Sequence, residues 1–192
     1  NLGITLRKLG LLDKAEANYN QAKAIRPDFA EAHSNLGITL QELGRLEEAK
    51  SCYNQALTLK PDYAEAHRHL TVLKKFTSQD EQYLKMQGVY RDESTSEEQR
   101  CHINFGLAKA CEDLGDIKQA YAHYLEGNAQ RKKLLKYNIS QDLEVIGQIK
   151  FNYPLILQNA LESNDLEKTI SPIFIVGMPR SGTTLVEQII SS

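Results

Sequence analysis

The chain has 192 residues, of which 41% are hydrophobic and 25% are charged, a length that suits one domain or two small ones. Its 23 Lys and Arg against 25 Asp and Glu give a formal net charge of −2, which argues against a protein that binds nucleic acid by neutralising many phosphates. No apolar run reaches the roughly 18 residues that a membrane-spanning helix needs.

Residues 1–34 and 35–68 repeat one another with a period of 34 residues, and more than half of the aligned pairs are identical. The identical pairs include Gly10 and Gly44, Tyr19 and Tyr53, and Pro27 and Pro61. Such self-similarity is typical of a supersecondary unit that stacks on copies of itself.

Each repeat is predicted to form two helices joined by a glycine turn. Apolar residues at helical spacing precede Gly10 and Gly44, where glycine can adopt the left-handed conformation that ends a helix. A second helical pattern follows and ends before Pro27 and Pro61, because proline cannot continue a helix interior.

Other residues of the repeat predict how its helices pack. The small Gly3 and Gly37 let neighbouring helices approach closely, while Tyr19 and Tyr53 are expected to fill the space between the helix pairs. Asp28 is expected in the first turn of the next helix, where a negative charge is favourable against the helix dipole.

A third, degenerate unit is predicted after the two clear repeats. Residues 64–76 are expected to form one helix, and residues 79–91 a second helix capped by Thr77 or Ser78. The motif glycine is replaced by Thr71 in this unit.

A fourth unit is clearer, because leucine, glycine and alanine recur at the earlier spacing around Gly115. Ser94 or Ser96, followed by two glutamates, is expected to cap its first helix. The repeats then cover residues 1–133. The pattern resembles the tetratricopeptide repeat, which implies an α-solenoid that can bind a protein or peptide partner.

Asn1 and Asn35 occupy equal places on the first helix of each unit, the helix that lines the concave face in this repeat class. They resemble the asparagine row with which the repeats of protein O-linked N-acetylglucosamine transferase hold an extended peptide, since a carboxamide both donates and accepts hydrogen bonds. His69 replaces the third asparagine, and the alternative is that these residues simply face water. His33 and His67 repeat with the framework, and we interpret both as structural.

Residues 134–171 are predicted to be a helical connector followed by a linker. Ser140 is expected to cap a helix that ends near Tyr153, and Pro154 is expected to begin a second, short helix. Residues 162–171 are polar enough to form the linker.

The composition changes abruptly in residues 172–192. Residues 172–176 form a continuous apolar run that predicts a buried strand, and Gly177 to Thr184 form a glycine-bounded loop before an apolar helical pattern. A strand, a loop and a helix N-terminus in this order can bind phosphate. The alternative is an ordinary strand-to-helix turn, since two glycines at this spacing are common.

The loop differs from an ATP-binding or GTP-binding P-loop, because Thr183 stands where that motif has lysine and the cation is Arg180 instead. The segment resembles the 5′-phosphosulfate-binding loop of sulfotransferases. The chain as a whole is similar to bacterial proteins in which tetratricopeptide repeats precede a sulfotransferase domain, and the loop is similar to that of protein-tyrosine sulfotransferases. The expected fold is therefore mainly α, followed by the first strand, loop and helix of an α/β P-loop-like sulfotransferase domain.

The resemblance implies transfer of a sulfuryl group from 3′-phosphoadenosine 5′-phosphosulfate to an acceptor hydroxyl or amine, without a metal. It implies that Arg180 stabilises the leaving 5′-phosphate, and that the next four residues bind this phosphate through backbone amides and hydroxyls. These residues are Ser181, Gly182, Thr183 and Thr184.

The sequence contains no convincing general base, 3′-phosphate site or adenine pocket. Because it starts at Asn1 inside a repeat and stops at Ser192 inside an apolar helix pattern, we expect a piece of a larger sulfotransferase that is inactive by itself. Two alternatives remain open: a non-catalytic repeat scaffold that binds peptides in its concave groove, and a nucleotide kinase or NTPase with a variant loop.

The three cysteines, Cys52, Cys101 and Cys111, match no metal-binding or redox spacing. We interpret them as small buried hydrophobic residues of a protein in a reducing compartment. A cytoplasmic location is therefore expected, and no metal site is predicted.

Overall fold

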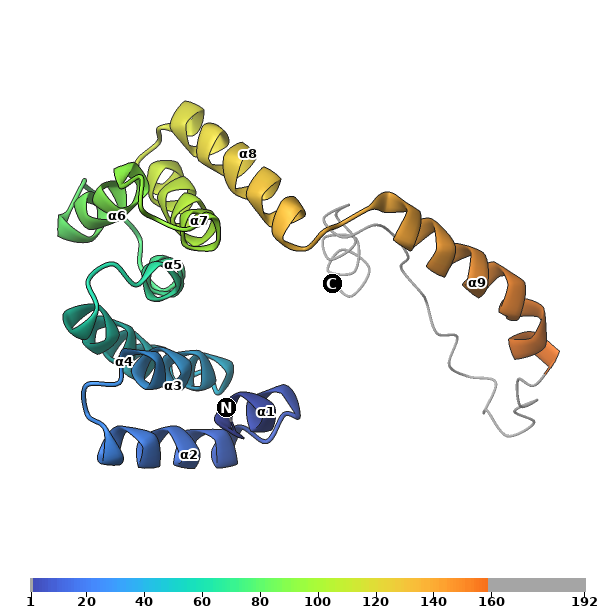
Figure 1. The fold of residues 1–192 in the computed structure, drawn as a ribbon, viewed down its shortest axis with the longest axis horizontal. Coiled ribbons are helices and arrows are strands. Elements are labelled where there is room, and N and C mark those ends of the chain that lie inside the picture. The colour runs from blue at the N-terminus through green and yellow to red at the C-terminus, as the bar shows by residue number, and fades with distance from the viewer. Residues whose placement is uncertain (1, 159–192) are drawn as a thin grey trace, which may run out of the picture. The chain divides into compact units, whose positions relative to one another are not determined.

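Residues 2–158 form a succession of α-helices in the computed structural model, which describes this part of the chain (Figure 1). The helices are α1 (Leu2–Lys8), α2 (Leu12–Ile25), α3 (Ala30–Glu42), α4 (Leu46–Leu59), α5 (Ala64–Val72), α6 (Glu81–Arg91), α7 (Glu97–Asp113), α8 (Ile117–Leu134) and α9 (Ile139–Gln158). Helices α1 to α8 belong to one compact unit and α9 to a second. The first unit is an α-solenoid, as the sequence predicts.

Glycine turns join α1 to α2, α3 to α4 and α7 to α8. Gly10, Gly44 and Gly115 have φ angles of 73°, 77° and 80°. These angles lie in the left-handed region, which residues with a Cβ atom rarely adopt. The predicted left-handed turns at Gly10 and Gly44 are therefore confirmed, and Gly115 forms the same turn in the fourth hairpin.

A tyrosine ring lies against a glycine within each of the first two hairpins. A Cβ atom added to Gly3 would lie 2.6 Å from Cζ of Tyr19, and one added to Gly37 would lie 2.6 Å from Cε1 of Tyr53. Tyr53 is fully buried and also stacks on the His69 ring of α5. The predicted close approach is confirmed, and Tyr53 contacts both its own hairpin and the next.

The turns before α3 and α5 are held by histidines. His33 Nε2 lies 3.0 Å from the Pro27 carbonyl oxygen, and His67 Nε2 lies 2.8 Å from the Pro61 carbonyl oxygen. Because a carbonyl only accepts, both Nε2 atoms donate. The structural role predicted for these two histidines is confirmed.

The place predicted for Asp28 is wrong. Helix α3 begins at Ala30, and Glu31 is the acidic residue of its first turn. Asp28 lies in the preceding turn, which the Phe29 amide closes by donating to the Arg26 carbonyl at 3.2 Å. The chain needs this turn to reverse direction before the helix can start.

The boundaries predicted for the third unit are also wrong. Helix α5 ends at Val72, well before Phe76, because the Phe76 amide donates to Asp113 Oδ2 of α7 at 3.1 Å and its ring is buried. Asp80 caps α6 by accepting from the Tyr83 amide at 3.0 Å. Neither of the two predicted caps, Thr77 and Ser78, holds this position.

The start of α7 agrees with the second of the two predicted caps. The Ser96 hydroxyl accepts from the Gln99 amide at 3.3 Å, and the Gln99 side chain accepts from the Ser96 amide at 3.2 Å. This reciprocal pair is a capping box, which satisfies two donors at the exposed end of the helix.

The buried residues of the first unit form two clusters. One lies among α1 to α5 and includes Tyr53 and Leu40, and the other lies among α5 to α8 and includes Met86 and Leu107. Helix α6 packs more closely on α7 than on α5. Helix α5 therefore contributes to both clusters, and α6 belongs with the last hairpin.

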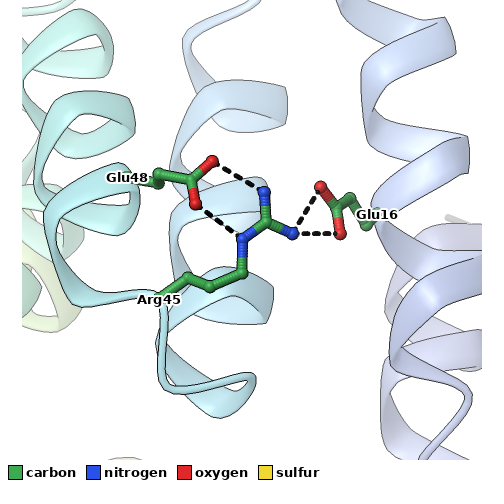
Figure 2. A network of polar contacts seen from close by, with 3 residues as sticks. All are labelled: Glu16, Arg45 and Glu48. Atoms are coloured by element: carbon green, nitrogen blue, oxygen red, sulfur yellow. Dashed lines mark hydrogen bonds and ion pairs between the residues drawn. The ribbon is translucent and has the colours of Figure 1, made fainter.

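Arg45 links the first two hairpins across the turn before α4 (Figure 2). Its Nη1 atom donates to both carboxylate oxygens of Glu16 in α2, at 2.9 and 2.8 Å. Its Nε and Nη2 atoms donate to Glu48 in α4, at 2.7 and 2.6 Å. The Glu48 and Glu16 carboxylates raise the pKa of Arg45, and Arg45 lowers the pKa of Glu48. The contact connects neighbouring repeats at an exposed position.

The helix break predicted at Pro154 is wrong, because α9 continues through this residue to Gln158. A proline costs a helix one backbone donor and can bend it, but it does not always end it. Ser140 lies inside the first turn of α9, since the helix begins at Ile139. The predicted linker at 162–171 and the predicted strand, loop and helix at 172–192 lie outside the described residues.

Candidate functional site

The phosphosulfate-loop residues predicted from the sequence, and one of the two groove asparagines, fall outside the part of the chain that the structure describes. These are Arg180, Ser181, Gly182, Thr183, Thr184 and Asn1. Among the described residues, the candidate site lies on the first helices of the hairpins, α3, α5 and α7.

We define the first-helix face as the partly buried positions Asn35 of α3, Glu65 and His69 of α5, and His102 and Phe105 of α7. Asn35 is half-buried, and its backbone carbonyl accepts from the Thr39 hydroxyl at 3.0 Å. A carboxamide in this environment can still donate to and accept from an extended backbone.

His69, which replaces the asparagine of the third unit, is held by neighbours on two sides. Its ring stacks on Tyr53 with centroids 5.5 Å apart and planes 12° from parallel. Its Nε2 atom lies 3.8 Å from Oε1 of Glu65. The hydrogen bond with His69 holds the pKa of the Glu65 carboxyl below its usual value. The residue that breaks the asparagine row thus joins α4 to α5.

A small pocket of about 200 Å³ lies between the start of α5 and the start of α7, lined by Glu65 and His102 among others. The Tyr63 hydroxyl donates to Glu65 Oε2 at 3.3 Å. Arg68 Nη1 lies 3.4 Å from His102 Nδ1, and the Arg68 guanidinium lies over the Phe105 ring at 5.6 Å. Burial lowers the pKa of His102, which favours the neutral ring that accepts from Arg68.

A further asparagine–x–glycine pair lies in α7 and was not predicted from the sequence. Asn104 and Gly106 repeat the spacing of Asn35 and Gly37, but this match lies two residues out of phase with the glycine turn at Gly115, on which the fourth unit was aligned. The asparagine–x–glycine spacing could have identified it.

Asn104 does not belong to the first-helix face. It is fully buried, with its Oδ1 atom 2.8 Å from His123 Nδ1 and its Nδ2 atom 3.0 Å from Gln130 Oε1. Both partners lie on α8. In α7 the repeated asparagine therefore holds the next helix instead of facing a groove.

Comparisons with known proteins agree with the helical hairpins. Residues 30–63 match the tetratricopeptide repeat family model, and residues 3–44 match a second model described as TPR repeat. Together with the 34-residue period of the hairpins, these matches identify residues 3–63 as tetratricopeptide repeats.

A further match extends this assignment at the C-terminal end, where residues 172–192 match the sulfotransferase family model. The chain thus combines tetratricopeptide repeats with a sulfotransferase-like segment, as the sequence predicts. An uncharacterized protein of Aquifex aeolicus (strain VF5) is 28% identical over 121 residues, which cover 62% of this chain and 16% of that relative.

Three other features concern membrane spans, metal sites and the cysteines. No helix within residues 2–158 combines the length and apolar character needed to cross a membrane. Over the same stretch, no group of three His, Cys, Asp or Glu side chains converges as a metal site would require. Cys101 and Cys111 are buried, with burial raising the pKa of each thiol, whereas Cys52 is only half-buried.

Proposed function

We propose that this chain takes part in the transfer of a sulfuryl group from 3′-phosphoadenosine 5′-phosphosulfate to an acceptor hydroxyl or amine. The observation that carries the proposal is the sulfotransferase family match at residues 172–192. The loop inside it supports the proposal, because Arg180 and Thr183 suit a phosphosulfate better than a triphosphate.

In the proposed reaction, the bond between sulfur and the 5′-phosphate oxygen breaks as a bond from sulfur to the acceptor oxygen or nitrogen forms. The acceptor gives its proton to water, and the electron pair of the broken bond stays on the phosphate. Arg180 would stabilise this charge. Backbone amides of the loop up to Thr184 would bind the same phosphate at the start of the helix.

The repeats would bring an acceptor-bearing protein to the reaction. Tetratricopeptide hairpins expose the first-helix face, where Asn35 can hydrogen-bond to an extended peptide without reading its side chains. The half-buried place of Asn35 on α3 supports this role.

Titration of the whole protein with 3′-phosphoadenosine 5′-phosphate tests the enzymatic proposal. We expect Arg180→Ala to weaken binding at least tenfold, or about 1.4 kcal/mol. Arg131→Ala, the same substitution at an exposed site on α8, is the matched control and should change affinity less than twofold. Equal affinity of the Arg180→Ala variant and the parent protein would refute the role of the loop.

A second candidate function, a non-catalytic scaffold that binds peptides, is favoured by Asn35. It predicts that Asn35→Ala weakens peptide capture from an array of extended peptides, while Asn54→Ala on the exposed side of α4 does not. Under this reading, no labelled sulfate reaches any acceptor in a transfer assay with the whole protein. Transfer of label would favour the enzyme.

A further inference from the structure

A cleft of about 410 Å³ separates α6 from α8, with Leu107 of α7 among its lining residues. Its volume falls within the range of small-molecule sites. The α6 wall includes Tyr83, Gln87 and Tyr90, and the α8 wall includes Gln119 and His123. The first-helix face contributes none of the described residues that line it.

A chain of hydrogen bonds fixes the polar groups behind the α8 wall. Glu126 Oε1 accepts from Gln130 Nε2 at 3.0 Å, and Gln130 Oε1 accepts from Asn104 Nδ2 at 3.0 Å. Asn104 Oδ1 then lies 2.8 Å from His123 Nδ1. Asn104 is fully buried, so this chain runs from the cleft wall into the protein and back.

The Glu126 carboxylate determines the tautomer of His123 through this chain. A carboxylate only accepts, so the Gln130 group that faces it is the NH₂ and the Gln130 oxygen faces Asn104. That oxygen requires the Asn104 NH₂, which turns the Asn104 oxygen towards His123. His123 Nδ1 must therefore donate. In the neutral ring the other nitrogen, Nε2, then carries the lone pair and can accept a hydrogen bond, and His123 is one of the residues that line the cleft.

Burial supports the neutral form, because it lowers the pKa of His123. Tyr90 holds the ring from α6: its ring meets the His123 ring edge-on, with centroids 5.1 Å apart and planes at 80°. The Tyr90 hydroxyl donates to Glu126 Oε2 at 2.7 Å. The imidazole is thus positioned from both walls before any ligand enters.

The remaining lining groups define the ligand chemistry. Asp116 and Glu126 place two carboxylates on the cleft, against the single cation Arg91 among its lining residues, so phosphate, sulfate and carboxylate ligands are disfavoured. His123 Nε2 adds a further acceptor. The Gln119 carboxamide offers a donor and an acceptor together, which suits hydroxyl groups. The Gln87 carboxamide already donates to the Tyr83 hydroxyl at 3.0 Å and accepts from Arg91 Nη2 at 3.3 Å. Tyr83 is buried, so the lining tyrosine whose partly exposed ring suits the C–H face of a sugar is Tyr90.

We propose that the cleft between α6 and α8 binds a neutral saccharide unit, with His123 Nε2 accepting a hydrogen bond from one of its hydroxyl groups. This site is separate from the sulfuryl-transfer chemistry proposed above and needs no sulfate donor. Its test can fail or succeed whatever the fate of that proposal.

The test is an NMR and calorimetric titration of the 192-residue chain with glucose, galactose, N-acetylglucosamine and cellobiose. We expect at least one of them to shift the His123 ring signals saturably. His123→Ala and Gln119→Ala should each weaken that binding at least tenfold. The matched control, Lys118→Ala on the exposed side of α8, should stay within twofold of the parent chain.

Two counter-probes distinguish other ligand classes. Inorganic phosphate and ethanolamine should leave the His123 signals unchanged, because the first is an anion and the second lacks a ring of hydroxyls. Saturable binding of either one at His123, or no response to any of the four sugars, would overturn the proposal. If His123→Ala fails to fold, the Gln119→Ala variant provides the test. Unchanged sugar affinity in that variant also overturns the proposal.

Discussion

Gly37 lies where the ring of Tyr53 crosses α3, and this contact leaves no room for a side chain. An added Cβ would lie 2.6 Å from the ring of a fully buried residue. We expect Gly37→Ala to lower the free energy of unfolding by about 1–3 kcal/mol, the usual cost of overpacking a core. Urea denaturation followed by circular dichroism measures this loss.

Gly88→Ala is the matched control for this substitution. Gly88 lies in α6 with no atom within 4 Å of an added Cβ, so alanine should raise stability by about 0.5–1 kcal/mol through its better helix propensity. Equal effects of the two substitutions would contradict the role assigned to the Gly37 contact.

Buried histidines make stability depend on pH. Burial lowers the pKa of His67, whose Nε2 atom donates to Pro61, and the unfolded chain has an ordinary value of about 6.5. The unfolded state therefore binds more protons as pH falls through 6.5, and the free energy of unfolding decreases until the pH reaches the folded pKa. His102 and His123 act in the same direction.

We expect the urea midpoint to be lower at pH 5.5 than at pH 7.5. His67→Gln should be less stable than the parent chain but should show a smaller difference between the two pH values. A midpoint that stays level or rises on acidification would show that these rings do not have to be neutral in the folded chain.

At the scale of the element, the N-terminal cap of α6 differs between the sequence-based prediction and the structure. The sequence predicts Thr77 or Ser78 as the cap, whereas the structure uses Asp80, which also pairs with Lys74. Asp80→Ala should therefore cost about 1–2 kcal/mol of stability. Thr77→Ala and Ser78→Ala should cost less than 0.5 kcal/mol. Thermal unfolding of the three variants measures these losses of stability. A larger loss for Thr77→Ala than for Asp80→Ala would support the cap predicted from the sequence.

Helix boundaries were predicted correctly where they depend on residues close by in the sequence. They were predicted wrongly where a residue far away in the sequence determines where the helix ends. The glycine turn at Gly44 and the capping box at Ser96 depend on residues within one turn of the chain. The end of α5 depends on Asp113, which captures the Phe76 amide from α7. No pattern around Phe76 indicates that partner.

At the scale of the whole solenoid unit, two buried clusters share α5. In repeat proteins each unit contacts chiefly its neighbours, so a local defect spreads only part of the way. Leu107→Ala should cost about 2–5 kcal/mol and should reduce hydrogen-exchange protection mainly in α6 to α8. Leu40→Ala should act mainly on α1 to α4.

Hydrogen exchange read by mass spectrometry checks this pair of substitutions. Each variant is the control for the other, because both remove the same atoms from a buried leucine. Loss of protection spread evenly over α1 to α8 in both variants would show one cooperative core instead of two coupled clusters.

The sequence by itself determined the repeat period, the helix content, the glycine turns and the resemblance of residues 172–192 to sulfotransferases, because these depend on residue types at short spacing. It also placed Asn35 on α3. It could not show that Asn104 is buried under α8 or that His123 is held as one tautomer, since these follow from hydrogen bonds between residues of α7 and α8 that are 19 and 26 positions apart in the chain. Only the packing of α6, α7 and α8 decides which polar groups satisfy one another and which remain available to a ligand.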